Sequence, residues 1–141
     1  MVDIVNIINV SEQTPTRTLG FYNVNNVMVF TEETPVASFG ESSFRAYTNY
    51  SDAVTDWGSE SKTAEVVKTM LSQSPSLLAG GGQILIAPYN QDSENPETLS
   101  EAITRLSADV YFGGVICTEY LTSSDIEAAA SVCQAMETIY L

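Results

Sequence analysis

The stretch Gln83-Ile-Leu-Ile-Ala-Pro88 decides the predicted fold of this chain. It is a short, continuous apolar run that follows Gly80-Gly81-Gly82 and ends at a proline. A run of this length without polar alternation is typical of a strand that is buried on both faces of its sheet. Such strands occur in sheets that helices cover on both sides, so the run indicates an α/β protein.

Beyond this run the chain alternates between helical and strand patterns. Asn95-Pro96-Glu97 predicts a helix start with proline at the first helical position, and the helix would bury Leu99, Ile103 and Leu106. Residues 110–117 predict the next strand, in which Gly113-Gly114 would permit a bulge or the close approach of a packed helix.

The last predicted helix begins at a capping box formed by Ser124 and Glu127 and runs to about residue 137. Its apolar side would contain Ile126, Ala129, Ala130, Val132 and Met136. Residues 138–141 predict the beginning of another strand. A strand that stops so early favours a polypeptide that continues beyond residue 141.

Strand and helix patterns also precede the central run. Strands are predicted over residues 24–31 and 43–48. Ser51 predicts the cap of a short helix over residues 52–57 that Gly58 terminates. A second helix starts at Ser59 or Ser61, carries Ala64, Val67, Met70 and Leu71 on one face, and stops at Ser74-Pro75.

These patterns together predict an α/β fold with α+β character at the N-terminus. We expect a mixed or parallel β-α-β-α-β core in two or three layers, because such connections are right-handed crossovers covered by helices. Residues 21–141 would form this domain, truncated at its C-terminal end. Residues 1–20 would form an N-terminal strand arm and its linker, which Pro15 interrupts.

The arm comprises residues 2–10, which are prone to form a β-strand and carry little charge. We expect it to pair with a sheet edge of another subunit, because an unpaired strand leaves its backbone groups unsatisfied. The alternative is an ordinary edge strand of its own domain. The apolar residues that would carry the pairing are Val2, Ile4, Val5, Ile7, Ile8 and Val10.

The composition argues against several classes of partner. The net charge is −13, from 18 acidic and 5 basic residues, whereas nucleic acids and anionic membranes require a basic face. No apolar run approaches the length of a membrane span, and the start lacks the basic region of a signal peptide. Cys117 and Cys133 lack neighbours with metal-ligand spacing, which favours reduced thiols in the cytosol.

The residues that usually carry catalysis are scarce. The chain has no histidine, which removes the commonest general base and metal ligand. Gly80-Gly81-Gly82 precedes a strand, whereas a phosphate-binding loop follows one and opens a helix. The carboxylate pairs Asp52/Asp56 and Asp92/Glu94 could be taken for acid–base pairs or a calcium site. Charge at a helix start explains the first pair and a polar loop explains the second. We therefore predict no enzyme activity and no cofactor or metal site, and we interpret Trp57 as a core or interface anchor.

Three segments of the chain together resemble the contractile phage tail sheath family. They are Tyr47-Thr-Asn-Tyr-Ser-Asp-Ala-Val-Thr-Asp-Trp-Gly58, Ala64-Glu-Val-Val-Lys-Thr-Met-Leu-Ser-Gln-Ser-Pro75 and the 83–88 run. The family shows a short helix ending in aromatic-Gly, a second helix and then an apolar strand. The order of the remaining predicted elements is also similar, although members of the family are longer.

This resemblance implies a structural virion protein that is assembled in the host cytoplasm. The subunit would polymerise in helical or hexameric rings around the tail tube above the baseplate, joined by strand exchange through its terminal arms. Contraction of the sheath would drive the tube through the host envelope.

Two alternatives remain open. One is another structural or adaptor component of a contractile tail or baseplate. The other is a small-molecule-binding α/β domain, whose pocket would lie beyond the carboxyl ends of the strands. That pocket would contain Tyr89, Asn90, Glu119 and Tyr120.

Overall fold

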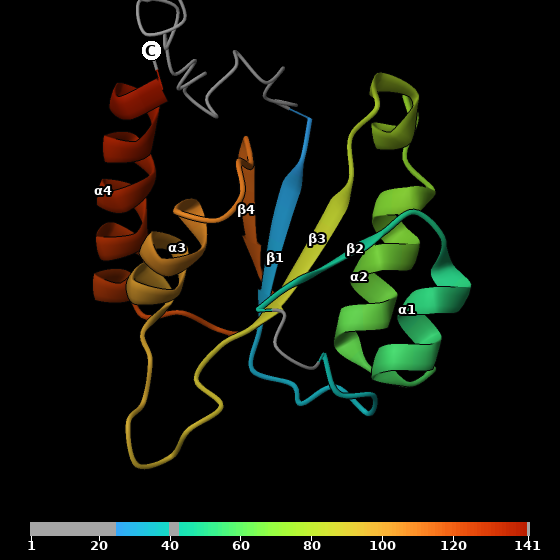
Figure 1. Cartoon of the computed structure of the whole chain (residues 1–141), viewed down its shortest axis with the longest axis horizontal. Coiled ribbons are helices and arrows are strands. Elements are labelled where there is room, and N and C mark those ends of the chain that lie inside the picture. The colour runs from blue at the N-terminus through green and yellow to red at the C-terminus, as the bar shows by residue number, and fades with distance from the viewer. Residues whose placement is uncertain (1–24, 40–42, 141) are drawn as a thin grey trace, which may run out of the picture.

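A computed structural model describes residues 25–39 and 43–140 of the chain (Figure 1). The predicted arm and linker lie outside these residues. The elements, in chain order, are β1 (Val27–Thr31), β2 (Arg45–Tyr47), α1 (Tyr50–Trp57), α2 (Lys62–Leu71), the 3₁₀ turn η2 (Leu77–Gly80), β3 (Ile84–Pro88), α3 (Leu99–Ser107), β4 (Gly114–Cys117) and α4 (Ser123–Tyr140).

The four described strands form one mixed sheet in the order β2-β3-β1-β4. Strand β1 pairs in parallel with β3 and with β4, and Val27 lies opposite Ile84 on one side and Gly114 on the other. Strand β2 is antiparallel to β3. The predicted α/β fold with a mixed sheet is therefore confirmed.

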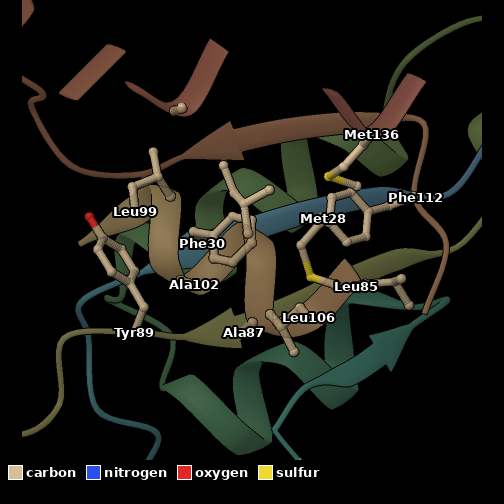
Figure 2. Packing of buried hydrophobic residues seen from close by; sticks show 12 residues of the cluster. Met28, Phe30, Leu85, Ala87, Tyr89, Leu99, Ala102, Leu106, Phe112 and Met136 are labelled. Atoms are coloured by element: carbon tan, nitrogen blue, oxygen red, sulfur yellow. The ribbon is translucent and has the colours of Figure 1, made fainter. Parts of the chain in front are cut away.

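Helices cover both faces of the sheet, which gives three layers (Figure 1). On one face α1 and α2 pack against Val29, Ile84 and Ile86, with Trp57 and Val67 as helical partners. On the other face α3 and α4 enclose a second core, and Figure 2 shows its members. They include Met28, Phe30, Leu85, Leu99, Ile103, Leu106, Phe112 and Met136.

The predicted strand over residues 83–88 is confirmed as β3, and its first four residues are buried. Asn25, which lies just before β1, and Leu77 of η2 approach the glycines before β3 closely. A Cβ atom at position 82 would lie 2.7 Å from the carbonyl oxygen of Asn25 and 2.9 Å from that of Leu77. Gly81 adopts a left-handed conformation with φ of 74° and caps the 3₁₀ turn η2.

Three helix starts differ from the sequence prediction. Helix α1 is capped by Asn49 and not by Ser51, because the Asn49 side chain accepts from the N–H of Asp52. Helix α3 begins after Thr98 and not at Pro96, because Thr98 and Glu101 form a reciprocal capping box.

Helix α4 likewise differs, because its cap lies two residues before the predicted one. Its capping box consists of Thr122 and Asp125, each of which accepts the N–H of the other. The predicted box of Ser124 and Glu127 is wrong. In contrast, Ser61 caps α2 and Gly58 ends α1 with φ of 92°, both within the predicted choices.

The C-terminal predictions need two further corrections. The predicted strand at residues 138–141 is wrong, because α4 continues to Tyr140 without a glycine or proline to stop it. Ile126 and Ala130 were expected on the buried side of this helix, yet both are exposed. The strand predicted over residues 110–117 is shorter, because it joins the sheet only at Gly114.

Candidate functional site

Trp57 is the last residue of α1, and its side chain lies in the core between this helix and the sheet. Only 4% of its surface is exposed. Its indole N–H donates to the hydroxyl of Tyr47 at 3.0 Å, and that hydroxyl donates to Oδ2 of Asp56 at 2.7 Å. Arg45 donates to the same carboxylate oxygen at 2.6 Å. Phe39 stacks edge-on against the indole, with 5.5 Å between ring centroids. The side chain is therefore an anchor of this subunit's own core.

The hydroxyl of Tyr47 is held in its protonated form. Burial raises the pKa of Tyr47, and the hydrogen bond to Asp56 raises it further. A protonated hydroxyl can donate to the carboxylate while it accepts from the indole. The cluster thus satisfies the polar atoms that the fold buries, and its role is structural.

A crevice opens beyond the carboxyl ends of β1, β3 and β4. After β1 the chain passes through β2 to α1 and α2 on one face of the sheet, whereas β4 leads to α4 on the other face, so the connections diverge at this point. The crevice has a volume of about 420 Å³. It is lined by Tyr89, Asn90, Glu119 and Tyr120, the residues predicted for such a pocket, together with Glu32, Pro96, Glu97, Thr98, Leu99, Leu121 and Asp125.

Most carboxylates around the crevice already have partners within the chain. Arg105 holds Glu97 through two hydrogen bonds of 2.7 and 2.9 Å. The ammonium of Lys62 lies 3.4 Å from Glu119. The amide of Asn90 donates to Glu32 at 3.1 Å. These pairs hold together loops that follow three different strands.

Glu33 occupies the N-terminus of α2, where proteins with diverging strand connections often hold a phosphate. Its carboxylate accepts the backbone N–H of Lys62 at 3.1 Å and that of Thr63 at 3.0 Å. Burial alone would raise the pKa of Glu33, but the hydrogen bonds from Thr63 and Lys62 outweigh it and lower the pKa. The chain therefore supplies its own anion to this helix end.

Tyr89, which lines the crevice, also contacts Cys117 of β4, with 3.5 Å between the hydroxyl oxygen and the sulfur. Burial raises the pKa of Tyr89, and the contact with Cys117 adds to the effect. The phenol is therefore a neutral hydrogen-bonding group. Such a pair can orient a ligand or another side chain, but it offers no phenolate for proton abstraction.

A second feature lies at the edge of the sheet. Of the described strands only β1 pairs with β4, so the other edge of β4 is unpaired in this part of the chain. A groove of about 240 Å³ runs between this edge and α4. It is lined by Tyr111, Phe112, Gly113, Gly114, Val115, Cys133 and Met136.

Within residues 25–39 and 43–140, no group of three or more histidine, cysteine or acidic side chains is arranged to hold a metal ion. No helix in the same residues is long and apolar enough to cross a membrane.

The geometry defines the class of the protein, which is a doubly wound α/β domain with three layers. No protein-family model matches the chain, and no curated protein or solved structure shows significant similarity to it. The fold class alone does not define a function.

Sequence reasoning located the crevice but missed Glu33 and the groove. The crevice follows from the ends of predicted strands, which is a local signal. Glu33 meets Lys62 and Thr63 about 30 positions later in the chain, and the groove joins β4 to α4. A weak signal for Glu33 was the acidic pair Glu32-Glu33 directly after an apolar strand.

Proposed function

We propose that the chain is a structural subunit of a contractile phage tail sheath. It would polymerise around the tail tube above the baseplate, through strands exchanged between subunits, and shorten to drive the tube through the host envelope. In this proposal the protein is part of the virion and is not an enzyme.

The observation that carries the proposal is the packing of the segment on which the resemblance rests. Tyr47 ends β2, and the short helix α1 that follows ends at Trp57 and Gly58. Trp57 returns to hydrogen-bond Tyr47, and Gly58 turns the chain with a positive φ. Both residues of this aromatic-Gly helix end thus have a role in the local packing and backbone, which supports the view that the three segments behind the resemblance belong together.

Strand exchange is supported by the charge and the edges of the described domain. Subunits with a net charge of −13 repel one another, so assembly needs contacts that do not depend on opposite charges. Backbone hydrogen bonds between an arm and a sheet edge meet that need. Residues 2–10 contain one charged residue, Asp3.

Electron microscopy of the full-length protein tests the proposal. We expect long hollow cylinders for the unaltered chain. Deletion of residues 1–10 should leave a folded monomer that does not assemble, and a glycine-serine sequence of equal length in place of residues 2–10 controls for chain length. A deletion that unfolds the domain would instead indicate that the segment is an edge strand of its own subunit.

The same images address the nearest alternative. If labelled protein is found at the baseplate of particles and not along the tail, the chain is an adaptor and not a sheath subunit.

A second candidate function rests on the crevice. Its position at diverging strand connections is where α/β proteins of many kinds bind small molecules. A ligand that raises the melting temperature, and loses this effect when Asn90 and Tyr120 are replaced by alanine, would favour a small-molecule-binding domain.

A further inference from the structure

We propose that the open edge of β4, together with the groove beside α4, accepts residues 2–10 of a second copy of the chain. This inference rests on the proposed function and assigns the acceptor surface for the exchanged strand. The arm would extend the sheet to five strands beyond β4. Its side chains would alternate between the groove and the opposite face.

The two sheet edges differ in how readily they accept a strand. Strand β2 has three residues, and it carries the charged Arg45 and an exposed Ala46. Short, charged edges are the means by which proteins discourage strand addition. Strand β4 is Gly-Val-Ile-Cys, which is uncharged and only half-buried over its whole length. The β4 edge is therefore the better acceptor.

The backbone of β4 has groups available for a new strand. The N–H of Thr118 donates to the carbonyl of Phe30 in β1. Because the direction of these bonds alternates along a strand, the N–H groups of Val115 and Cys117 point to the open edge. A strand placed there would satisfy groups that β1 cannot reach.

The groove supplies apolar contacts for the side chains of the incoming strand. Phe112 and Val115 lie on the sheet side, and Cys133 and Met136 lie on α4. The arm offers aliphatic residues at both even and odd positions, among them Ile4, Val5, Ile7 and Ile8. Burial of such side chains in a groove favours association by the hydrophobic effect.

The place where the chain enters the domain argues for exchange between copies. Gly113 donates its N–H to the carbonyl of Asn26 at 2.8 Å, so the entering chain lies directly beside the start of β4. Neighbouring elements of one subunit are usually joined by 2–6 residues. The residues between the arm and β1, 11–26, instead reach roughly 50 Å when extended. That length suits an acceptor in another subunit.

Cysteine cross-linking tests this assignment, because the native Cys133 lines the groove. Ile7→Cys and Ile8→Cys would be made separately in one tagged copy and mixed with an untagged copy under assembly conditions. We expect one of the two adjacent positions to cross-link to Cys133 of the other copy and its neighbour to give at most background, because they face opposite sides of a strand. Peptide mass spectrometry would identify the thiols that are joined.

The variant Ala46→Cys, made in the acceptor copy, reports on the competing β2 edge. Cross-links from the arm to position 46, cross-links confined to single copies, or equal yields at both arm positions would overturn the assignment. If cylinders form with any of these patterns, or without cross-links, the sheath proposal stands and the β4 acceptor is wrong. If neither cylinders nor cross-links form, both proposals are wrong.

A backbone variant provides an independent measurement. Val115→Pro removes an N–H that points to the open edge and spares the bonds from β4 to β1. We expect loss of assembly with an unchanged circular dichroism spectrum. Assembly at the level of the unaltered chain would overturn the proposal, and if the variant does not fold, the cross-linking pattern decides.

Discussion

At the residue scale, the hydroxyl of Tyr47 joins two neighbours that the fold buries. It accepts from the indole of Trp57 and donates to the carboxylate of Asp56, which is itself only 6% exposed. Removing this one oxygen atom takes away the acceptor of the indole N–H and one of the two hydrogen bonds to the carboxylate of Asp56, which Arg45 still holds. A buried polar group that lacks a hydrogen bond lowers the free energy of unfolding, so loss of the Tyr47 hydroxyl should be measurable.

Tyr47→Phe should lower the free energy of unfolding by about 1–3 kcal/mol, because the indole N–H and one bond to Asp56 are left unsatisfied. Urea unfolding followed by tryptophan fluorescence would measure the loss. Tyr120→Phe is the matched control, since Tyr120 is fully exposed and its substitution should have no effect. Equal stability of the Tyr47→Phe variant and the unaltered chain would contradict the network.

Glu33 predicts a particular dependence of stability on pH. Its pKa is lowered in the folded state, so its carboxylate stabilises the fold above the pKa of the unfolded chain. That contribution is lost as the pH falls through the lowered, folded-state pKa. Glu33→Gln should therefore reduce stability at pH 7 and lose less stability than the unaltered chain on acidification.

Chemical unfolding between pH 7 and pH 3 would measure this difference. Glu60→Gln serves as the control, because Glu60 is exposed and accepts a hydrogen bond from the adjacent Ser59. If the two variants give parallel pH curves, Glu33 does not stabilise α2 in the way described.

At the scale of elements, the sequence predicts apolar faces well and helix ends less well. Leu99, Ile103 and Leu106 are buried as expected because their spacing follows the helical period directly. The start of α3 was misplaced because both Pro96 and Thr98 are acceptable start signals. The choice between them depends on the bonds of Glu101, which a pattern does not reveal.

Strand β4 and the final helix show a different limit of prediction. An apolar strand pattern extends from Val110, but only residues from Gly114 pair with β1. The residues after Met136 are compatible with strand or helix, and continuation of α4 decided the outcome. The crevice could be predicted because strand ends define it, whereas the groove could not, because it needs the position of one helix relative to one edge.

Thr98→Ala tests the capping box of α3. It should destabilise the domain by about 1 kcal/mol, because the N–H of Glu101 loses its acceptor at the helix start. Thermal unfolding would measure this change. Thr104→Ala, within the same helix and exposed, should be neutral or slightly stabilising, since alanine has the higher helix propensity. Equal effects of the two substitutions would argue against the box.

At the scale of the whole molecule, the excess of acidic residues sets the conditions for assembly. Copies that each carry a charge of −13 repel one another over a distance that salt controls. The screening length is about 30 Å at 0.01 M salt and about 8 Å at 0.15 M. Assembly through backbone and apolar contacts should therefore be promoted by salt.

Light scattering of the full-length protein at increasing sodium chloride would test this expectation. We expect little assembly at about 0.01 M and a clear increase by about 0.15 M. The variant without residues 1–10 provides the control, since it should remain monomeric throughout. Assembly that weakens as salt is added would indicate that attraction between opposite charges dominates the contacts.

The central position of β1 has a consequence for biosynthesis. This strand leaves the ribosome first among those described, yet its two neighbours are β3 and β4, and β4 ends at Cys117. The nascent chain thus carries an unpaired apolar strand until most of the polypeptide has emerged, and it must avoid aggregation during that time. Chains released before residue 117 should be captured by chaperones, whereas chains extended through α4 should fold without them.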